Sequence, residues 1–255
     1  MAASNQPARL SVMPAKAGIE QPTDAPLDSR VRGNDRRDGY KFHLKAHCSN
    51  AVDRMAGDER AMMNLPDLLH DIRSCAVCKG SLPLGPRPIV QAGRLARVLV
   101  IGQAPGRRAH DSGLPWDDLS GARLRQWMGI DEARFYNPDL VALMAMGFCY
   151  PGASRTGGDH PPRPECAPLW HERLRTHMGN VRLTLLVGHH AQKAYLRDAS
   201  GARLTGNVRN FEQFLPGLLP LPHPSWRSTI WMRRNPWFET KLLPTLRAAV
   251  AAALG

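Results

Sequence analysis

Short runs of consecutive apolar residues alternate with longer amphipathic segments from about residue 65 to the end of the chain. The short runs are rich in Val, Ile and Leu and end at Gly or Pro, which is typical of strands buried on both faces of a parallel sheet. They predict four strands, at residues 97–102, 140–146, 183–188 and 217–222. The amphipathic segments predict a helix that begins at residue 65 and carries two cysteines at its C-terminal end, and further helices at 121–128, 167–178, 190–197 and 236–254.

The alternation of strands and helices indicates an α/β fold, in which helices cover both faces of a parallel sheet. Ligands bind such sheets at the carboxyl ends of the strands. We therefore look for functional residues in the loops that follow Gly102, Met146, Gly188 and Pro222.

Residues 1–61 show no sustained period and are rich in small and polar residues. We expect this segment to be disordered, or a spurious extension before a start at Met62 or Met63, and residues 62–255 to form the folded domain. The segment also lacks the apolar centre of a secretory signal. No apolar run in the chain approaches the roughly 18 residues that span a bilayer, so we expect no membrane partner.

The net charge of +12 is carried mostly by arginine, with 28 Arg against 6 Lys, and +10 of it falls on the last 195 residues. Guanidinium groups match phosphate geometry, which favours a polyanionic partner. A genome rich in G and C would also encode Arg in place of Lys, so composition by itself leaves both explanations open.

Five cysteines without a secretory signal argue against a disulfide framework. Four of them lie in the expected domain, at Cys75, Cys78, Cys149 and Cys166. One tight Cys-x-x-Cys pair is a weak signal for zinc, and four thiolates at irregular spacing also suit a [4Fe–4S] cluster. The spacing leaves open both a metal or cluster site and a set of buried thiols.

Two of the predicted loops carry candidate chemistry. The first begins GQAPG (102–106), where the glycines permit close backbone approach and the amide of Gln103 can both donate and accept hydrogen bonds. The second holds His223 stiffly between two prolines. Both loops would lie at the carboxyl edge of the sheet.

These motifs resemble those of the uracil-DNA glycosylase superfamily, especially its iron–sulfur, family-4-like branch. The first motif is GQAPG (102–106), which continues to a Gly-Leu-Pro-Trp sequence ending at Trp116, and the second is the HPS sequence at 223–225. The four cysteines also match that branch in place and order. The resemblance covers about residues 62–255.

The resemblance implies a three-layer α/β/α sandwich around a short, mainly four-stranded parallel sheet. It implies that Trp116 stacks on an extruded base, that Gln103 contacts the base or positions water, and that His223 donates a hydrogen bond to O2 of the departing uracil. The substrate-binding residues would be Trp116, Gly102, Ala104, Gly106, Ser225 and Arg227. The ligands of a structural [4Fe–4S] cluster would be Cys75, Cys78, Cys149 and Cys166.

Two positions depart from the family pattern. Ala104 stands where the most efficient branch has a water-activating Asp, and Ala145 stands where family-4-like enzymes often have an Asn that reads uracil. Asp111 and Asp117 are the carboxylates available near the first motif, and we expect Asp111, which follows His110, to be the third catalytic residue.

The expected function is that of a monofunctional DNA glycosylase of base excision repair, which hydrolyses the N-glycosidic bond of deoxyuridine, releases uracil and leaves an abasic site. Its partner would be uracil-containing DNA, and it would act as a monomer in the bacterial cytoplasm, at the nucleoid. One alternative is a cluster-containing protein that binds damaged DNA without efficient excision. Another is a glycosylase for a different lesion, such as xanthine, hypoxanthine or mismatched thymine.

Overall fold

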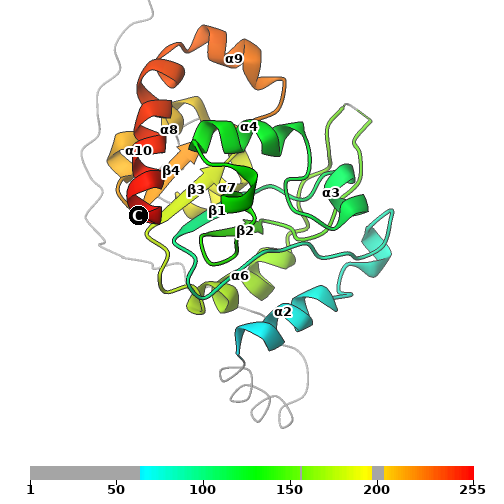
Figure 1. The fold of residues 1–255 in the computed structure, drawn as a ribbon. Helices are drawn as coiled ribbons and strands as arrows, with labels where there is room; N and C mark the ends of the chain where they lie inside the picture. The colour runs from blue at the N-terminus through cyan, green and yellow to red at the C-terminus, as the bar shows by residue number, and fades with distance from the viewer. Residues whose placement is uncertain (1–63, 156, 197–203) are drawn as a thin grey trace, which may run out of the picture. The chain divides into compact units, whose positions relative to one another are not determined.

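Four parallel strands form the centre of the fold (Figure 1). The computed structural model describes residues 64–155, 157–196 and 204–255, which all belong to one unit, Ser49–Gly255. The strands are β1 (Val98–Gly102), β2 (Val141–Ala145), β3 (Leu183–Val187) and β4 (Leu218–Leu221). Each lies within the run predicted for it, and nearly all of their residues are buried, as in a sheet covered on both faces.

Helices precede, connect and follow these strands. They are α2 (Leu65–Arg73), α3 (Arg107–Ser112), α4 (Leu119–Met128), α5 (Glu132–Phe135), α6 (Cys166–Thr176), α7 (His189–Tyr195), α8 (Leu204–Arg209), α9 (Ser228–Arg234) and α10 (Leu243–Leu254). Short helical turns are η1 (Lys79–Ser81), η3 (Phe211–Phe214) and η4 (Phe238–Leu242), the last a π-helical turn that runs into α10.

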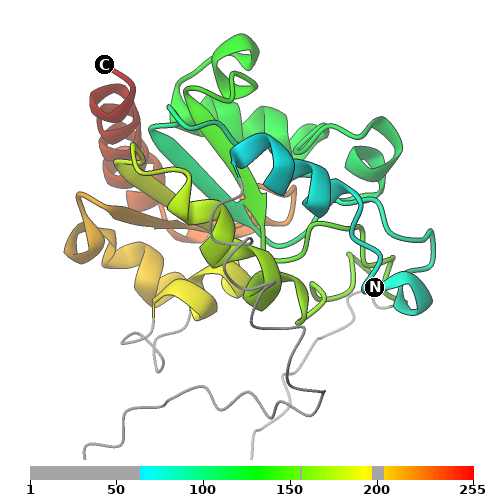
Figure 2. The ribbon, with the colours of Figure 1, turned by 90° about the horizontal axis from the view of Figure 1, so that it is seen from below.

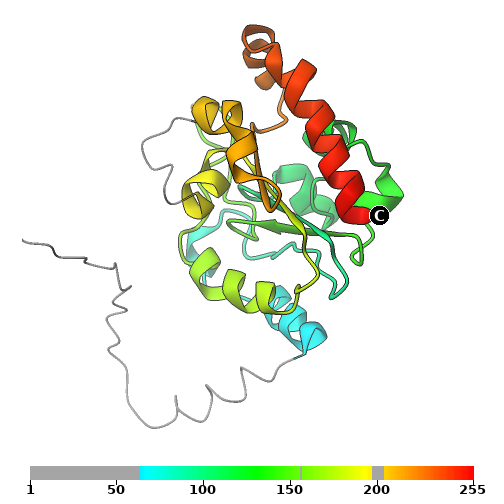
Figure 3. The ribbon, with the colours of Figure 1, turned by 90° about the vertical axis from the view of Figure 1, so that its left-hand side faces the viewer.

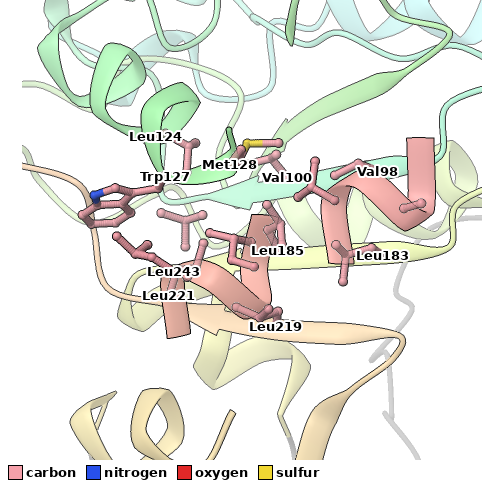
Figure 4. Close-up of a cluster of buried hydrophobic side chains, with 14 of the residues drawn as sticks. Val98, Val100, Leu124, Trp127, Met128, Leu183, Leu185, Leu219, Leu221 and Leu243 are labelled. Carbon is pink, nitrogen blue, oxygen red and sulfur yellow. The ribbon is translucent and has the colours of Figure 1, made fainter. Parts of the chain in front are cut away.

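One face of the sheet packs against α4 and α10. Successive side chains of a strand point to opposite faces, so Val98 and Val100 share this face with Leu185 of β3. They meet Trp127 of α4 and Leu243 of α10 in one buried apolar cluster (Figure 4).

The alternate strand residues pack on the other face. Leu99 and Ile101 belong to a second apolar cluster with Ile72 of α2, Leu174 of α6 and Ala191 of α7. Seen from below, α2 and α6 lie in front of the sheet (Figure 2), and from the side the sheet lies between α10 and α6 (Figure 3). The predicted three-layer α/β/α sandwich around a four-stranded parallel sheet is confirmed.

The strand order is β2-β1-β3-β4, so the chain moves outward from β1 to β2 and then crosses to the other side of β1 to form β3. Adjacent strands whose connections leave in opposite directions open a crevice at their carboxyl ends, where α/β proteins bind ligands. In this sheet the switch point lies between β1 and β3, beside the loop that follows β1.

The structure differs from the sequence prediction in the loop after β1. Residues 107–112 of this loop form α3, which the apolar pattern did not reveal because only Ala109 and His110 of this short helix are buried. The helix ends where Gly113 takes a left-handed φ of 78°. The expectation for residues 1–61 lies outside the described part of the chain. No helix within the described residues is long and apolar enough to cross a membrane.

Candidate active site

A cavity of about 500 Å³ opens at the carboxyl ends of β1, β2 and β4. Eight of the nine non-cysteine residues predicted for the site line it, namely Gly102, Gln103, Ala104, Gly106, Trp116, His223, Ser225 and Arg227. The two sequence motifs, far apart along the chain, therefore form the walls of one cavity.

Trp116 and His223 stack on each other in this cavity, with ring centroids 5.8 Å apart and an interplanar angle of 27°. The indole lies directly over Gly102, where a Cβ would be 2.8 Å from Cζ2 of Trp116. Gly121 lies under the backbone carbonyl of Trp116 and leaves no room for a side chain. Trp116 itself has a φ of 59°, a left-handed conformation that is uncommon outside glycine and tends to cluster at functional sites.

His223 is held in a neutral state. Burial lowers the pKa of His223. The nearby Asp118 carboxylate acts in the opposite direction, but its effect is the smaller of the two. Ser228 donates a hydrogen bond from its hydroxyl to the backbone carbonyl of His223, and Nη1 of Arg123 donates to the carbonyl of Ser225 at 2.7 Å. A neutral imidazole in a fixed loop offers one N–H donor to a ligand in the cavity.

Gln103 is fixed at the end of β1. Its side-chain nitrogen donates to the carbonyl of His160 at 3.1 Å, and its backbone carbonyl accepts from Gly147 at 3.0 Å. With the amide nitrogen engaged in this way, the carbonyl oxygen of the side chain suits an N–H group of a bound base.

The predicted catalytic carboxylate, Asp111, lies away from this cavity. Asp111 lies on α3, is 54% exposed and pairs with Nε of Arg107 at 2.9 Å, and it does not line the cavity, because one turn of α3 turns its side chain outward. Asp118 and Asp159 line the cavity instead. Sequence reasoning missed Asp159, whose only signal was a Gly-Gly-Asp turn between the third and fourth cysteines.

Ala145 lines the cavity at the end of β2, so no amide side chain reads a base from this strand. Its backbone is fixed from behind by the buried His171, which lies 2.9 Å from the Ala145 carbonyl through Nε2 and 2.7 Å from the Tyr195 hydroxyl through Nδ1. Burial lowers the pKa of His171 to about 4, so this ring is neutral at physiological pH.

The comparison with protein families matches this architecture. The sequence model described as "Uracil DNA glycosylase superfamily" matches residues 91–247, a range that includes both motifs and every strand. The chain belongs to the uracil DNA glycosylase superfamily. Membership makes it a DNA-binding glycosylase, and the cavity at the carboxyl edge of the sheet is its candidate active site.

The rim of the glycosylase cavity combines aromatic and basic groups. Trp226 is 70% exposed, and the guanidinium of Arg227 lies over its ring, 5.4 Å from the centroid. Two basic side chains of the domain already have acidic partners. Arg107 pairs with Asp111, and Lys241 pairs with Glu212.

Four of the five cysteines of the glycosylase gather around a second, smaller cavity on the α6 side of the sheet, with apolar walls that include Phe148 and Trp170. Cys75 and Cys78 follow α2, Cys149 follows β2, and Cys166 begins α6. The backbone N–H of Phe148 donates to Sγ of Cys166 at 3.3 Å.

Two of these four thiols, Cys149 and Cys166, have a raised proton affinity. Burial raises the pKa of Cys149 to about 11 and that of Cys166 to about 12, so a bound cation is needed to make them thiolates. Within residues 64–155, 157–196 and 204–255, no group of three or more His, Cys, Asp or Glu side chains is placed so that it could hold a metal ion. The residue types nevertheless fit a four-cysteine site, because all four cysteines line one apolar cavity.

Proposed function

We propose that this glycosylase removes uracil from DNA by hydrolysis and leaves an abasic site. The observation that carries the proposal is the stacked pair of Trp116 and His223, which come from separate motifs and meet over the GQAPG turn (102–106) in one cavity. An extruded base needs a flat stacking surface, polar groups for its edge and a donor for the charge that develops as it departs. The cavity supplies all three.

In the proposed reaction Trp116 stacks on the extruded uracil and Gln103 accepts a hydrogen bond from its N3–H. The neutral His223 donates to O2, where negative charge develops as the bond from N1 to the sugar C1′ breaks. No lysine is among the described residues that line the cavity, so a Schiff base with the sugar has no amine to form it. This supports a monofunctional enzyme.

The remaining features fit a DNA partner. Trp226 and Arg227 at the rim suit insertion beside the extruded nucleotide and contact with a phosphate. The excess of +10 over the last 195 residues suits the phosphate backbone. We propose that the enzyme works as a monomer, on DNA of the nucleoid in the cytoplasm.

We further propose that Cys75, Cys78, Cys149 and Cys166 hold a [4Fe–4S] cluster with a structural role. The cluster would join the end of α2, the end of β2 and the start of α6 through four iron–sulfur bonds. Anaerobically purified protein should be brown and contain about four iron and four sulfide ions per chain. A colourless preparation with zinc would refute this assignment.

A second candidate substrate follows from Ala145. Because this residue offers no amide to the base, selectivity for uracil rests on Gln103 and His223. A purine lesion such as xanthine or hypoxanthine presents a similar carbonyl and N–H edge, and it is the alternative that the cavity supports. Competition between the three lesions in otherwise identical duplexes separates the possibilities.

The deciding experiment incubates the full chain with single- and double-stranded oligonucleotides that contain one deoxyuridine. We expect free uracil and abasic sites in equal amounts, with strand breaks only after alkali. A matched thymidine oligonucleotide should give neither product. Tight binding of uracil DNA with no base released at enzyme excess would instead identify a damage-binding protein without excision.

A further inference from the structure

Two carboxylates lie beside the turn of the first motif. Asp118 precedes α4, and Asp159 ends the hairpin in which Ala153 bridges to Asp159. A Cβ placed on Gly106 would lie 3.7 Å from Oδ2 of Asp159 and 3.9 Å from Oδ2 of Asp118. Both oxygens therefore lie beside the GQAPG turn (102–106), which has no carboxylate of its own.

The two carboxylates have different surroundings. Oδ1 of Asp118 accepts the backbone N–H of Gly121 at 2.7 Å and caps α4, which fixes the position of this carboxylate. Asp159 has no such role in a helix. Burial raises its pKa above the usual range, the Asp118 carboxylate adds to this rise, and His160 opposes it.

Other charged or titratable groups also face Asp159. Tyr150 interacts with it electrostatically from the segment after β2. The guanidinium of Arg227 lies close to the preceding glycines, where a Cβ on Gly157 or Gly158 would be 3.0 or 3.1 Å from its nitrogens. The carboxylate is thus partly buried, and Asp118 and His160 are close enough to affect its proton affinity.

We propose that Asp159 is the catalytic carboxylate that accepts the proton of the attacking water, in place of the side chain that Ala104 lacks. The proposal rests on the function proposed above for this cavity. The bond between C1′ and the base nitrogen breaks, and its electron pair leaves with the base, whose charge His223 stabilises. The water oxygen bonds to C1′, its proton passes to Asp159, and solvent later protonates the released base.

Geometry selects Asp159 over the other carboxylates. Asp111 lies outside the cavity in an exposed ion pair. Asp118 has one oxygen committed to the α4 cap and influences His223 electrostatically, which suits a fixed charge. Asp159 lines the same cavity without either commitment, and its raised proton affinity brings it closer to that of a base useful near neutral pH.

The test compares the wild type with Asp159→Asn in two measurements on the full chain. Single-turnover base release should fall about 100-fold, since general base catalysis contributes about 10²–10⁴-fold. The rise of the wild-type rate with pH should also disappear, which a purely structural role would not cause. Asp139→Asn, an exposed carboxylate at the opposite edge of the sheet, should leave both properties unchanged.

The second measurement needs no base release. Duplexes with a cationic pyrrolidine abasic analogue or a neutral tetrahydrofuran analogue are titrated with each protein. Wild type should bind the cationic analogue at least 10-fold tighter, because Asp159 would lie close to the sugar cation, and Asp159→Asn should lose this preference while still binding the neutral analogue.

The outcomes are separable. If Asp159→Asn keeps the wild-type rate, pH profile and preference for the cationic analogue, Asp159 does not have the proposed role. A loss of base release seen in Asp111→Asn but not in Asp159→Asn would also overturn this role. Release of xanthine but not uracil by the wild type would overturn the proposed substrate. The role of Asp159 would then be decided by its effect on xanthine release and on the analogue preference.

Discussion

His171 is expected to make the fold sensitive to acid. It is 5% exposed, and burial lowers its pKa from 6.5 to about 4. Above pH 6.5 the ring is neutral in both the folded and the unfolded chain and has no effect on pH dependence. Between pH 6.5 and about 4 only the unfolded chain binds a proton, so stability falls as the pH falls through this range.

The size of this effect follows from the shift in pKa. The full shift in pKa corresponds to about 3 kcal/mol of the free energy of unfolding. About 2 kcal/mol of this stability is lost between pH 8 and pH 5. The measurement is the free energy of unfolding by urea at a series of pH values. His171→Phe keeps an aromatic ring beside Phe148 but removes the hydrogen bonds of the histidine, so the variant should be less stable than wild type at pH 8. Because its ring does not titrate, the variant should lose about 2 kcal/mol less than wild type on going from pH 8 to pH 5.

Tyr195→Phe is the matched control, because it removes the hydroxyl that contacts Nδ1 and keeps the buried histidine. Its stability should fall with acid as in the wild type. If His171→Phe and the wild type lose the same free energy between pH 8 and pH 5, the ring does not titrate as its burial indicates and the reasoning is wrong.

Three further predictions concern the cavity and the cysteines. His223→Ala should lower single-turnover uracil release by about 10²–10³-fold with DNA affinity within a few-fold, and equal losses in both would indicate a positioning role instead. Gly121→Ala should displace the Trp116 backbone, lower the melting temperature and weaken base release, whereas an unchanged melting temperature would contradict the packing described for this turn. Cys166→Ser should lower the iron content of the purified protein, Cys48→Ser should not, and equal iron in both would argue against the proposed cluster.

The sequence was sufficient to predict the sheet because each strand is buried on both sides. Runs such as residues 97–102 contain almost no polar residue, so neither their type nor their place depends on distant contacts. The motif residues at Gly102 and His223 were equally predictable as neighbours, since parallel strands bring their carboxyl ends to one edge.

The carboxylates were not predictable in the same way. Asp111 is closer in sequence to the motif than Asp159, but a single helical turn carries it out of the cavity. Asp159 comes from a segment after β2 and reaches the Gly106 turn through a hairpin that no apolar period describes. Where loops from different strands meet, separation along the sequence does not indicate which residues line the same cavity.

Trp116 illustrates a third case. Family resemblance supplied the residue, but the left-handed backbone that presents it depends on Gly102 and Gly121, which are small enough to let the ring and carbonyl approach. The need for glycine at these two positions cannot be predicted from the sequence, because it depends on contacts between separate segments of the chain.

The separation between the apolar layers and the cavity has a consequence for protein engineering. The residues that would contact a base stand on loops and strand ends, while the two apolar clusters lie on the faces of the sheet below them. Base preference is therefore open to redesign at one or two positions in loops or at strand ends, with Ala145→Asn at the end of β2 as the natural first change. Such libraries can be screened for new lesions without rebuilding the scaffold that carries them.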